Sequence, residues 1–274
     1  MYMKFREEMF KKNFEPLAKK SSPIALYDLS RHDDAIDAAM AEKGPEDGWR
    51  ISDDGVIGGY SRGKVDMIRT KADYKRWMAD EELQDVFKNL DEDKSNEDSG
   101  HFVPFLRWSG QIDTTVGLTS DAQRSGFCAV RAAQYPYGGA NLQGLYNALE
   151  IVCRSDGRAY TVNLKVSSFF PGDMYQGYIN VPPTHPIKEE IPDNGGGFER
   201  LVLPFNKFAL TAFGRLREVQ RELDNDIEVE HIGFTLMDGR DGPFQFDLHR
   251  IRAVNFDGIS IRGEEGEERV KIAR

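Results

Sequence analysis

Chemistry is suggested first by a glycine-rich stretch that begins with Asp53 and Asp54 and continues through Gly55, Gly58 and Gly59. Bare backbone amides can hold a phosphate, but phosphate loops space their glycines as G-x-G-x-x-G or G-x-x-x-x-G-K-[ST] and lead into a helix. This stretch has neither spacing. Adjacent aspartates on an extended chain point to opposite faces, which makes them poor acid–base partners. We predict an architectural turn in which glycines adopt positive φ and one aspartate accepts backbone N–H bonds.

The histidines and cysteines form no recognisable catalytic or metal-binding pattern. Zinc needs three or four converging ligands, usually at H-x-H, H-E-x-x-H or similar spacings. The five histidines show no such spacing and are His32, His101, His185, His231 and His249. Cys128 and Cys153 each lie in an apolar run, which is typical of a buried, unreactive thiol. The sequence therefore predicts no metal, no cofactor and no enzymatic activity, with a metal site gathered from distant loops as the alternative.

The segments that must position these residues are short and β-forming. From Trp49 to Phe256, apolar and polar side chains alternate over short runs separated by Gly, Pro, Asn and Asp. Regular helices between the runs are missing, which disfavours a parallel sheet. We predict an all-β, antiparallel β-sandwich of the jelly-roll class, with strands near 105–113, 126–133, 148–153, 160–167, 176–181, 200–204, 231–237 and 243–256. The residues predicted to face inward include Phe127, Val130, Ile151, Val162, Leu164, Leu203, Phe234 and Phe246.

Composition excludes several classes of protein. The chain has 274 residues, of which 39% are hydrophobic, enough for a sizeable core. Its formal net charge of -10 disfavours nucleic acids, which are bound through clustered Lys and Arg. No apolar run approaches the roughly 20 residues of a transmembrane helix. Only two cysteines are present, which excludes a disulfide-dense scaffold and favours a reducing compartment.

Three segments depart from the β-pattern. Residues 1–48 predict an N-terminal helical extension, residues 73–96 an acidic helical insertion, and residues 257–274 a charged, irregular tail. A short helix is also predicted over 212–223. The extension and the insertion each carry apolar residues on one side, and these either cap their own domain or contact a partner. The candidates for partner contacts are Phe10, Phe14, Trp77, Met78 and Phe87.

A carbohydrate-binding module is the alternative function that the residues themselves suggest. Sandwiches of this class often stack sugars on exposed aromatic rings. The aromatic residues that could supply such a platform are Tyr135, Tyr137, Phe169, Phe170, Tyr175 and Tyr178.

The order of several short motifs resembles the complex I intermediate-associated protein 30 family. The stretch D-D-G-V-I-G-G-Y-S from Asp53 is similar to the family signature N-D-x-V-M-G-G-x-S, with Asp in place of Asn and Ile in place of Met. Further matches span the region 49–256. The residues that carry the resemblance are Asp53, Asp54, Gly55, Val56, Gly58, Gly59, Ser61, Gly126, Phe127, Arg131, Asp156, Gly157, Arg158, Tyr160, Tyr175, Gln176, Pro204 and Phe205.

This resemblance implies a galactose-binding-domain-like jelly roll over 49–256 without a catalytic centre. It further implies a chaperone-like scaffold for assembly of mitochondrial respiratory complex I, or an accessory subunit retained in it. Complex I subunits and other assembly factors would be its partners, at the matrix face of the inner membrane, with peripheral membrane association. The signature residues are expected to be structural.

Overall fold

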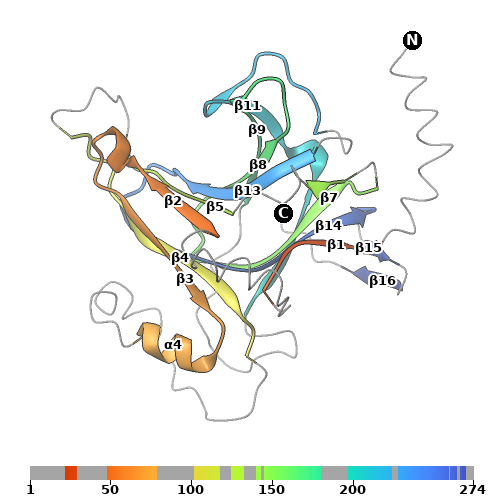
Figure 1. Cartoon of the computed structure of the whole chain (residues 1–274), viewed down its shortest axis with the longest axis horizontal. Helices are drawn as coiled ribbons and strands as arrows, with labels where there is room; N and C mark the ends of the chain where they lie inside the picture. The colour runs from red at the N-terminus through yellow and green to blue at the C-terminus, as the bar shows by residue number, and fades with distance from the viewer. Residues whose placement is uncertain are drawn as a thin grey trace.

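The computed structural model of the chain describes residues 22–29, 48–78, 102–117, 125–132, 140–142, 145–179, 197–223, 228–258, 260–263 and 266–269. Within these residues, two antiparallel sheets of eight strands each face one another across a hydrophobic core (Figure 1). The predicted all-β sandwich is therefore confirmed.

The first sheet is built around one long strand, β14 (Gly242–Phe256). One edge of β14 pairs with β7 (Ala148–Ser155), which is followed by β10 (Glu199–Pro204). The other edge pairs first with β4 (Phe105–Ile112) and then with β1 (Ile24–Asp28), and β3 (Arg62–Ile68) pairs with β4. A hairpin of β15 (Ser260–Gly263) and β16 (Gly266–Arg269) continues from the end of β14.

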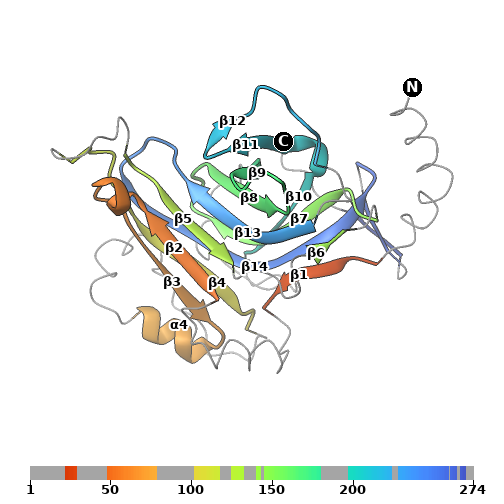
Figure 2. The same ribbon diagram turned by 45° about the horizontal axis from the view of Figure 1, so that its top comes forward.

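The second sheet places its strands in the order β12, β11, β9, β8, β13, β5, β2 (Figure 2). Their bounds are β12 (Arg215–Leu216), β11 (Ala209–Ala212), β9 (Asp173–Ile179), β8 (Tyr160–Val166), β13 (Glu228–Leu236), β5 (Cys128–Ala132) and β2 (Trp49–Asp53). A two-residue strand, β6 (Ala140–Asn141), also pairs with β13. Two 3-10 helices, η2 (Asp54–Ile57) and η4 (Phe205–Lys207), follow β2 and β10.

The core follows the predicted alternation with one exception. Most residues predicted to face inward are at most 2% exposed, and these are Val130, Ile151, Val162, Leu164, Phe234 and Phe246. Leu203 is half-buried but packs against the same cluster. Phe127 was predicted to face inward, and this is wrong: it is half-buried and lies before β5, where Cys128 and Val130 occupy the inward positions.

Helix α4 (Lys71–Met78) covers the outer face of the first sheet beside β3 and β4 (Figure 1). Thr70 and Asp73 form a reciprocal cap, in which each side chain accepts the other residue's backbone N–H. Trp77 is buried with Ile68 and Phe105 in a second, smaller core. The helix confirms the start of the predicted helical insertion, and residues 79–96 lie outside the described part.

Other predictions about the flanking segments need correction. The N-terminal extension is not helical throughout, because Ile24–Asp28 forms β1 and joins the sandwich. The predicted helix over 212–223 is wrong, because β11 and β12 form a hairpin there and no helix follows in 217–223. The tail is not irregular throughout, because it contains β15 and β16. In each case backbone pairing with another strand outweighs the local pattern.

Candidate functional site

Asp54, the first residue of η2, is fully buried and accepts five hydrogen bonds. Its Oδ1 accepts from the backbone N of Ser61 at 2.8 Å. Its Oδ2 accepts from the hydroxyls of Ser61 and Ser125 at 2.8 and 2.7 Å, and from the backbone N of Gly126 and Phe127 at 2.6 and 3.3 Å. One carboxylate therefore ties η2 to the chain entering β3 and to the chain entering β5.

The hydrogen bonds decide the protonation state of this carboxylate. Burial alone would raise the pKa of Asp54, but the bonds from Ser125, Gly126 and Ser61 favour the ionised form and hold its pKa below the usual value. Asp54 is thus an anion, and both of its carboxylate oxygens accept hydrogen bonds from inside the domain.

The glycines of this turn leave room for the carboxylate. Gly58 caps η2 in the left-handed conformation, with φ of 82°. A Cβ on Gly59 would lie 2.3 Å from both the carboxyl carbon of Asp54 and the hydroxyl of Ser125. Asp53 accepts a bond from the backbone N of Gly55 at 3.0 Å, so both aspartates support the turn, where the sequence had suggested only one.

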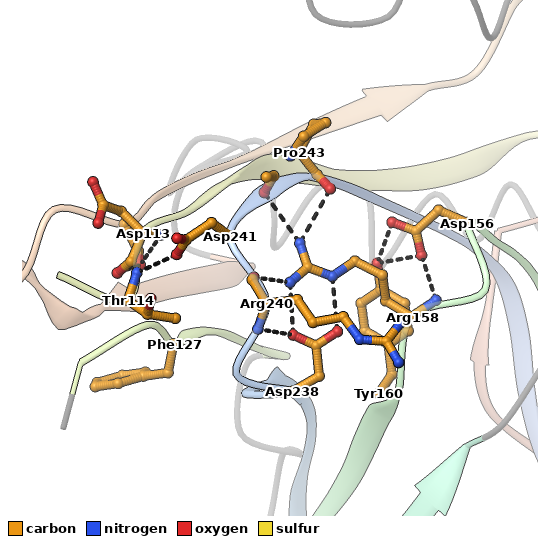
Figure 3. Close-up of polar contacts among 12 residues, drawn as sticks. Asp113, Thr114, Phe127, Asp156, Arg158, Tyr160, Asp238, Arg240, Asp241 and Pro243 are labelled. Carbon is orange, nitrogen blue, oxygen red and sulfur yellow. Dashed lines mark hydrogen bonds and ion pairs between the residues drawn. The ribbon is translucent and has the colours of Figure 1, made fainter.

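Arg158, in the turn between β7 and β8, forms a second polar cluster (Figure 3). Its guanidinium donates to both carboxylate oxygens of Asp238, at 2.9 and 2.6 Å. It also donates to the carbonyls of Arg240, Gly242 and Pro243. One side chain thus fixes the whole turn between β13 and β14.

Asp156 lies in the same β7–β8 turn as Arg158 and accepts a bond from the start of β14 (Figure 3). Its carboxylate accepts from the backbone N of Arg158 and of Gln245, and from the hydroxyl of Tyr160. Burial raises the pKa of Asp156 despite these bonds. The Tyr160 ring is fully buried, and burial together with Asp156 raises its pKa well above the usual value. Gly157 completes the turn with φ of 83°.

The two clusters are joined through the chain that follows β4. The Ser61 hydroxyl, which donates to Asp54, accepts from the backbone N of Asp113 at 3.0 Å. Thr114 then donates its backbone N–H to Asp241 at 2.6 Å (Figure 3). The turns β2–β3, β4–β5, β7–β8 and β13–β14 therefore share one polar network, which we call the signature network, at one end of the sandwich.

The remaining signature residues lie elsewhere. Tyr175 is buried in the core, and its hydroxyl donates to the carbonyl of Glu222 at 3.1 Å. Gln176 donates to Asn163 on the neighbouring strand. Pro204 precedes η4, whose first residue, Phe205, is buried. Arg131 and Val56 are exposed on β5 and η2, outside the signature network.

Sequence reasoning missed several members of the signature network. Asp238 and Asp241 are the first and fourth residues of the run Asp-Gly-Arg-Asp-Gly, whose composition is typical of a tight turn. That signal identifies a turn but cannot name its partners, because Arg158 is 80 residues from Asp238 in the chain.

The polar contacts of Asp54, Asp156 and Arg158 join parts of the same domain. Among the described residues, no three His, Cys, Asp or Glu side chains are grouped so as to hold a metal ion. Both cysteines are buried, and burial raises the pKa of Cys128 to about 12 and that of Cys153 as well. Burial, with Arg131 and Lys165 nearby, lowers the pKa of His231 to about 4. In the described part of the chain, no helix is long and apolar enough to cross a membrane.

Of the five residues predicted to contact a partner, the structure describes the side chain of Trp77. Trp77 is 8% exposed; its indole N donates to Asp66 at 3.0 Å, and its ring lies 4.2 Å from the guanidinium carbon of Arg107. Trp77 therefore caps its own domain and is not an exposed anchor. Phe10, Phe14 and Phe87 lie outside the described residues, and the side chain of Met78 is not described.

The architecture is that of an antiparallel β-sandwich. The family described as Complex I intermediate-associated protein 30 (CIA30) matches residues 39–248. The chain belongs to this family.

Two relatives show how far the similarity extends. Complex I intermediate-associated protein 30, mitochondrial, of Mus musculus is 32% identical over 147 residues, covering 52% of this chain and 42% of the relative. The protein of the same name from Neurospora crassa is 26% identical over 186 residues, covering 61% of this chain and 62% of the relative. The matches thus span about two-fifths and three-fifths of the length of these relatives.

Among solved structures, a family 11 carbohydrate-binding module of Clostridium thermocellum aligns with a TM-score of 0.45 and 11% identity, covering 85% of this chain and 95% of the module.

Proposed function

We propose that this chain is a non-catalytic scaffold for the assembly of mitochondrial respiratory complex I, or a subunit retained in the finished complex. Its partners would be complex I subunits and other assembly factors. It would act in the mitochondrial matrix, peripherally associated with the inner membrane.

The family match over residues 39–248 carries this proposal, since relatives in Mus musculus and Neurospora crassa bear the name complex I intermediate-associated protein 30, mitochondrial. The geometry agrees with a scaffold. In an active site, donors and acceptors point toward the position of a reacting group. In the signature network, Asp54 and Arg158 direct their polar atoms to other parts of the same domain.

A carbohydrate-binding function has less support from the described aromatic residues. Tyr175 is fully buried, so it offers no face to a sugar. Phe169 and Phe170 lie in the turn between β8 and β9, whereas the exposed Tyr178 lies near the other end of β9. These rings do not form one platform.

Affinity purification of the tagged full chain from intact mitochondria, followed by mass spectrometry, tests the proposal. We expect complex I subunits to be enriched over a matrix-targeted β-sandwich of similar size used as the control bait. A native gel of the eluate separates the two forms of the proposal: comigration with a smaller intermediate indicates an assembly factor, and comigration with mature complex I indicates a subunit. No enrichment, together with normal complex I in cells lacking the protein, would refute both.

A further inference from the structure

Three phenylalanine side chains in two adjacent turns of the second sheet are exposed to solvent. Phe169 and Phe170, in the turn between β8 and β9, are 94% and 53% exposed, and Phe213, in the hairpin between β11 and β12, is 86% exposed. We call these three residues the aromatic tip. β11 pairs with β9, so both turns lie at the same end of the sheet.

Contacts within the two turns hold these rings at the surface. The backbone N of Phe213 donates to the carbonyl of Gly172 at 3.3 Å, and a Cβ on Gly172 would lie 2.6 Å from the Phe213 ring. Phe213 has φ of 51°, the one positive value among the described non-glycine residues, a conformation that is costly for a bulky side chain. The chain thus keeps a strained phenylalanine at the surface.

Two arginines lie beside the aromatic tip. The guanidinium of Arg217 lies 4.9 Å from the centre of the Phe170 ring, and it binds the buried carboxylate of Asp173 at 2.6 Å. Arg221 is 3.6 Å from the same carboxylate, and its side chain is 62% exposed. Residues 165–174 and 209–223 together contain four Lys or Arg and three Asp or Glu, a net charge of +1 in a chain of net charge -10.

We infer that the aromatic tip inserts into the interface of an anionic lipid bilayer. Amphipathic surfaces that combine phenylalanine with Lys or Arg bind anionic membranes through apolar burial and electrostatic attraction. A standard protein interface instead buries about 800 Å² on each partner, supplied by some 20 to 30 residues. The aromatic tip consists of only two turns with three large rings, which is too few residues for an interface of that size and is enough to enter a lipid interface. The inference rests on the peripheral membrane association proposed above and gives it a site.

Vesicle binding by the full chain tests this inference. Phosphatidylcholine vesicles would be compared with vesicles in which about one-third of the lipid is phosphatidylserine, because the attraction requires anionic headgroups. We expect cosedimentation with the anionic vesicles only, weakened by salt. The double variant F169S/F213S should bind at least tenfold more weakly, since burying one phenylalanine is worth about tenfold or more. R221Q should bind about fivefold more weakly.

A matched control and a direct readout complete the test. Met237 is 67% exposed at the opposite end of β8, so M237S should bind like the wild type. The three tryptophans of the chain, Trp49, Trp77 and Trp108, are buried, so F169W adds an exposed reporter whose emission should shift to the blue on anionic vesicles. Unchanged melting temperatures would show that the variants are folded.

Three outcomes would overturn the inference: no binding by the wild type, equal binding by F169S/F213S, or equal loss of binding in M237S. If F169S/F213S instead fails to recover complex I subunits while the wild type ignores vesicles, the aromatic tip contacts protein and the lipid inference is wrong. Failure in the vesicle assay leaves the complex I proposal intact, because that proposal depends on the separate purification.

Discussion

Replacing Asp54 with Asn should destabilise the domain strongly while hardly changing the shape of the side chain. In the wild type, one carboxylate oxygen accepts from Ser61 N and the other accepts four bonds. An amide can keep its oxygen on the four-bond side, but its NH₂ then faces the Ser61 N–H. One buried donor loses its acceptor, at about 1–3 kcal/mol, and the other bonds lose the assistance of the charge. We expect D54N to lower the free energy of unfolding by about 3 kcal/mol, a large part of the roughly 5–15 kcal/mol of a typical domain.

Urea unfolding of the full chain at pH 7, followed by circular dichroism, measures this difference. The matched control is D53N in the same turn, because Asp53 is partly exposed and accepts one bond from Gly55. Its loss should cost less than about 1 kcal/mol. If D54N and D53N unfold at the same urea concentration, the assignment of Asp54 as the central acceptor is wrong.

The pH dependence provides a second check on Asp54. Its pKa in the folded chain lies below the usual value of 3.8, so its ionised form contributes its full stabilisation above that value. This contribution is lost as the pH falls from the unfolded-state pKa through the folded-state pKa, because the unfolded chain binds the proton first. The stability gap between wild type and D54N should therefore be constant from pH 5 to 7 and shrink below about pH 4. A gap independent of pH would contradict an ionised Asp54.

Five further variants test other parts of the structure by chemical denaturation. G59A should lower the free energy of unfolding by about 3 kcal/mol, because the added Cβ overpacks the turn. G239A has open space around its Cβ and should lower it by only about 1–2 kcal/mol, the cost of a positive φ. Equal losses in the two variants would contradict the close packing at Gly59. R158M leaves Asp238 without its bidentate partner and should cost about 3–5 kcal/mol, so a wild-type midpoint would rule out this buried pair. L164A should cost about 2–5 kcal/mol at a fully buried site, and an unchanged midpoint would exclude its inward placement. W77A should lower stability by about 3 kcal/mol and still recover complex I subunits below its melting temperature; normal stability with lost recovery would make Trp77 an interface residue.

The strands were predictable where one face of the strand is buried and the other carries polar side chains. Tyr160, Val162 and Leu164 alternate with polar residues, and the alternation follows directly from the two faces of β8. The turn at Asp54 was predictable as well, because glycine allows positive φ and a neighbouring aspartate can accept backbone N–H bonds, a combination typical of turns. These features depend on neighbouring residues, so they are visible in a short window of sequence.

Features that depend on distant pairing were not predictable. β1 and β15 are short strands whose identity comes from pairing with β14 rather than from their own composition. The segment 212–223 has apolar residues at helical spacing, yet Phe213 and Gly214 both adopt positive φ and turn the chain back into a hairpin. The bond from Thr114 to Asp241 joins residues 127 positions apart, beyond the reach of any local pattern.

The two ends of β8 differ in what they can offer another molecule. At the Tyr160 end, Asp54 and Arg158 direct their charged atoms to donors and acceptors of the same domain. A group engaged in this way can bind a partner only by breaking an internal bond, at a cost of about 1–3 kcal/mol for each polar atom left buried. At the Val166 end, Phe169 and Phe213 are exposed, so covering them breaks no internal polar bond of their side chains. Asp54 and Arg158 thus hold turns of the sandwich together, and we expect recognition to fall on surfaces away from them, such as the aromatic tip.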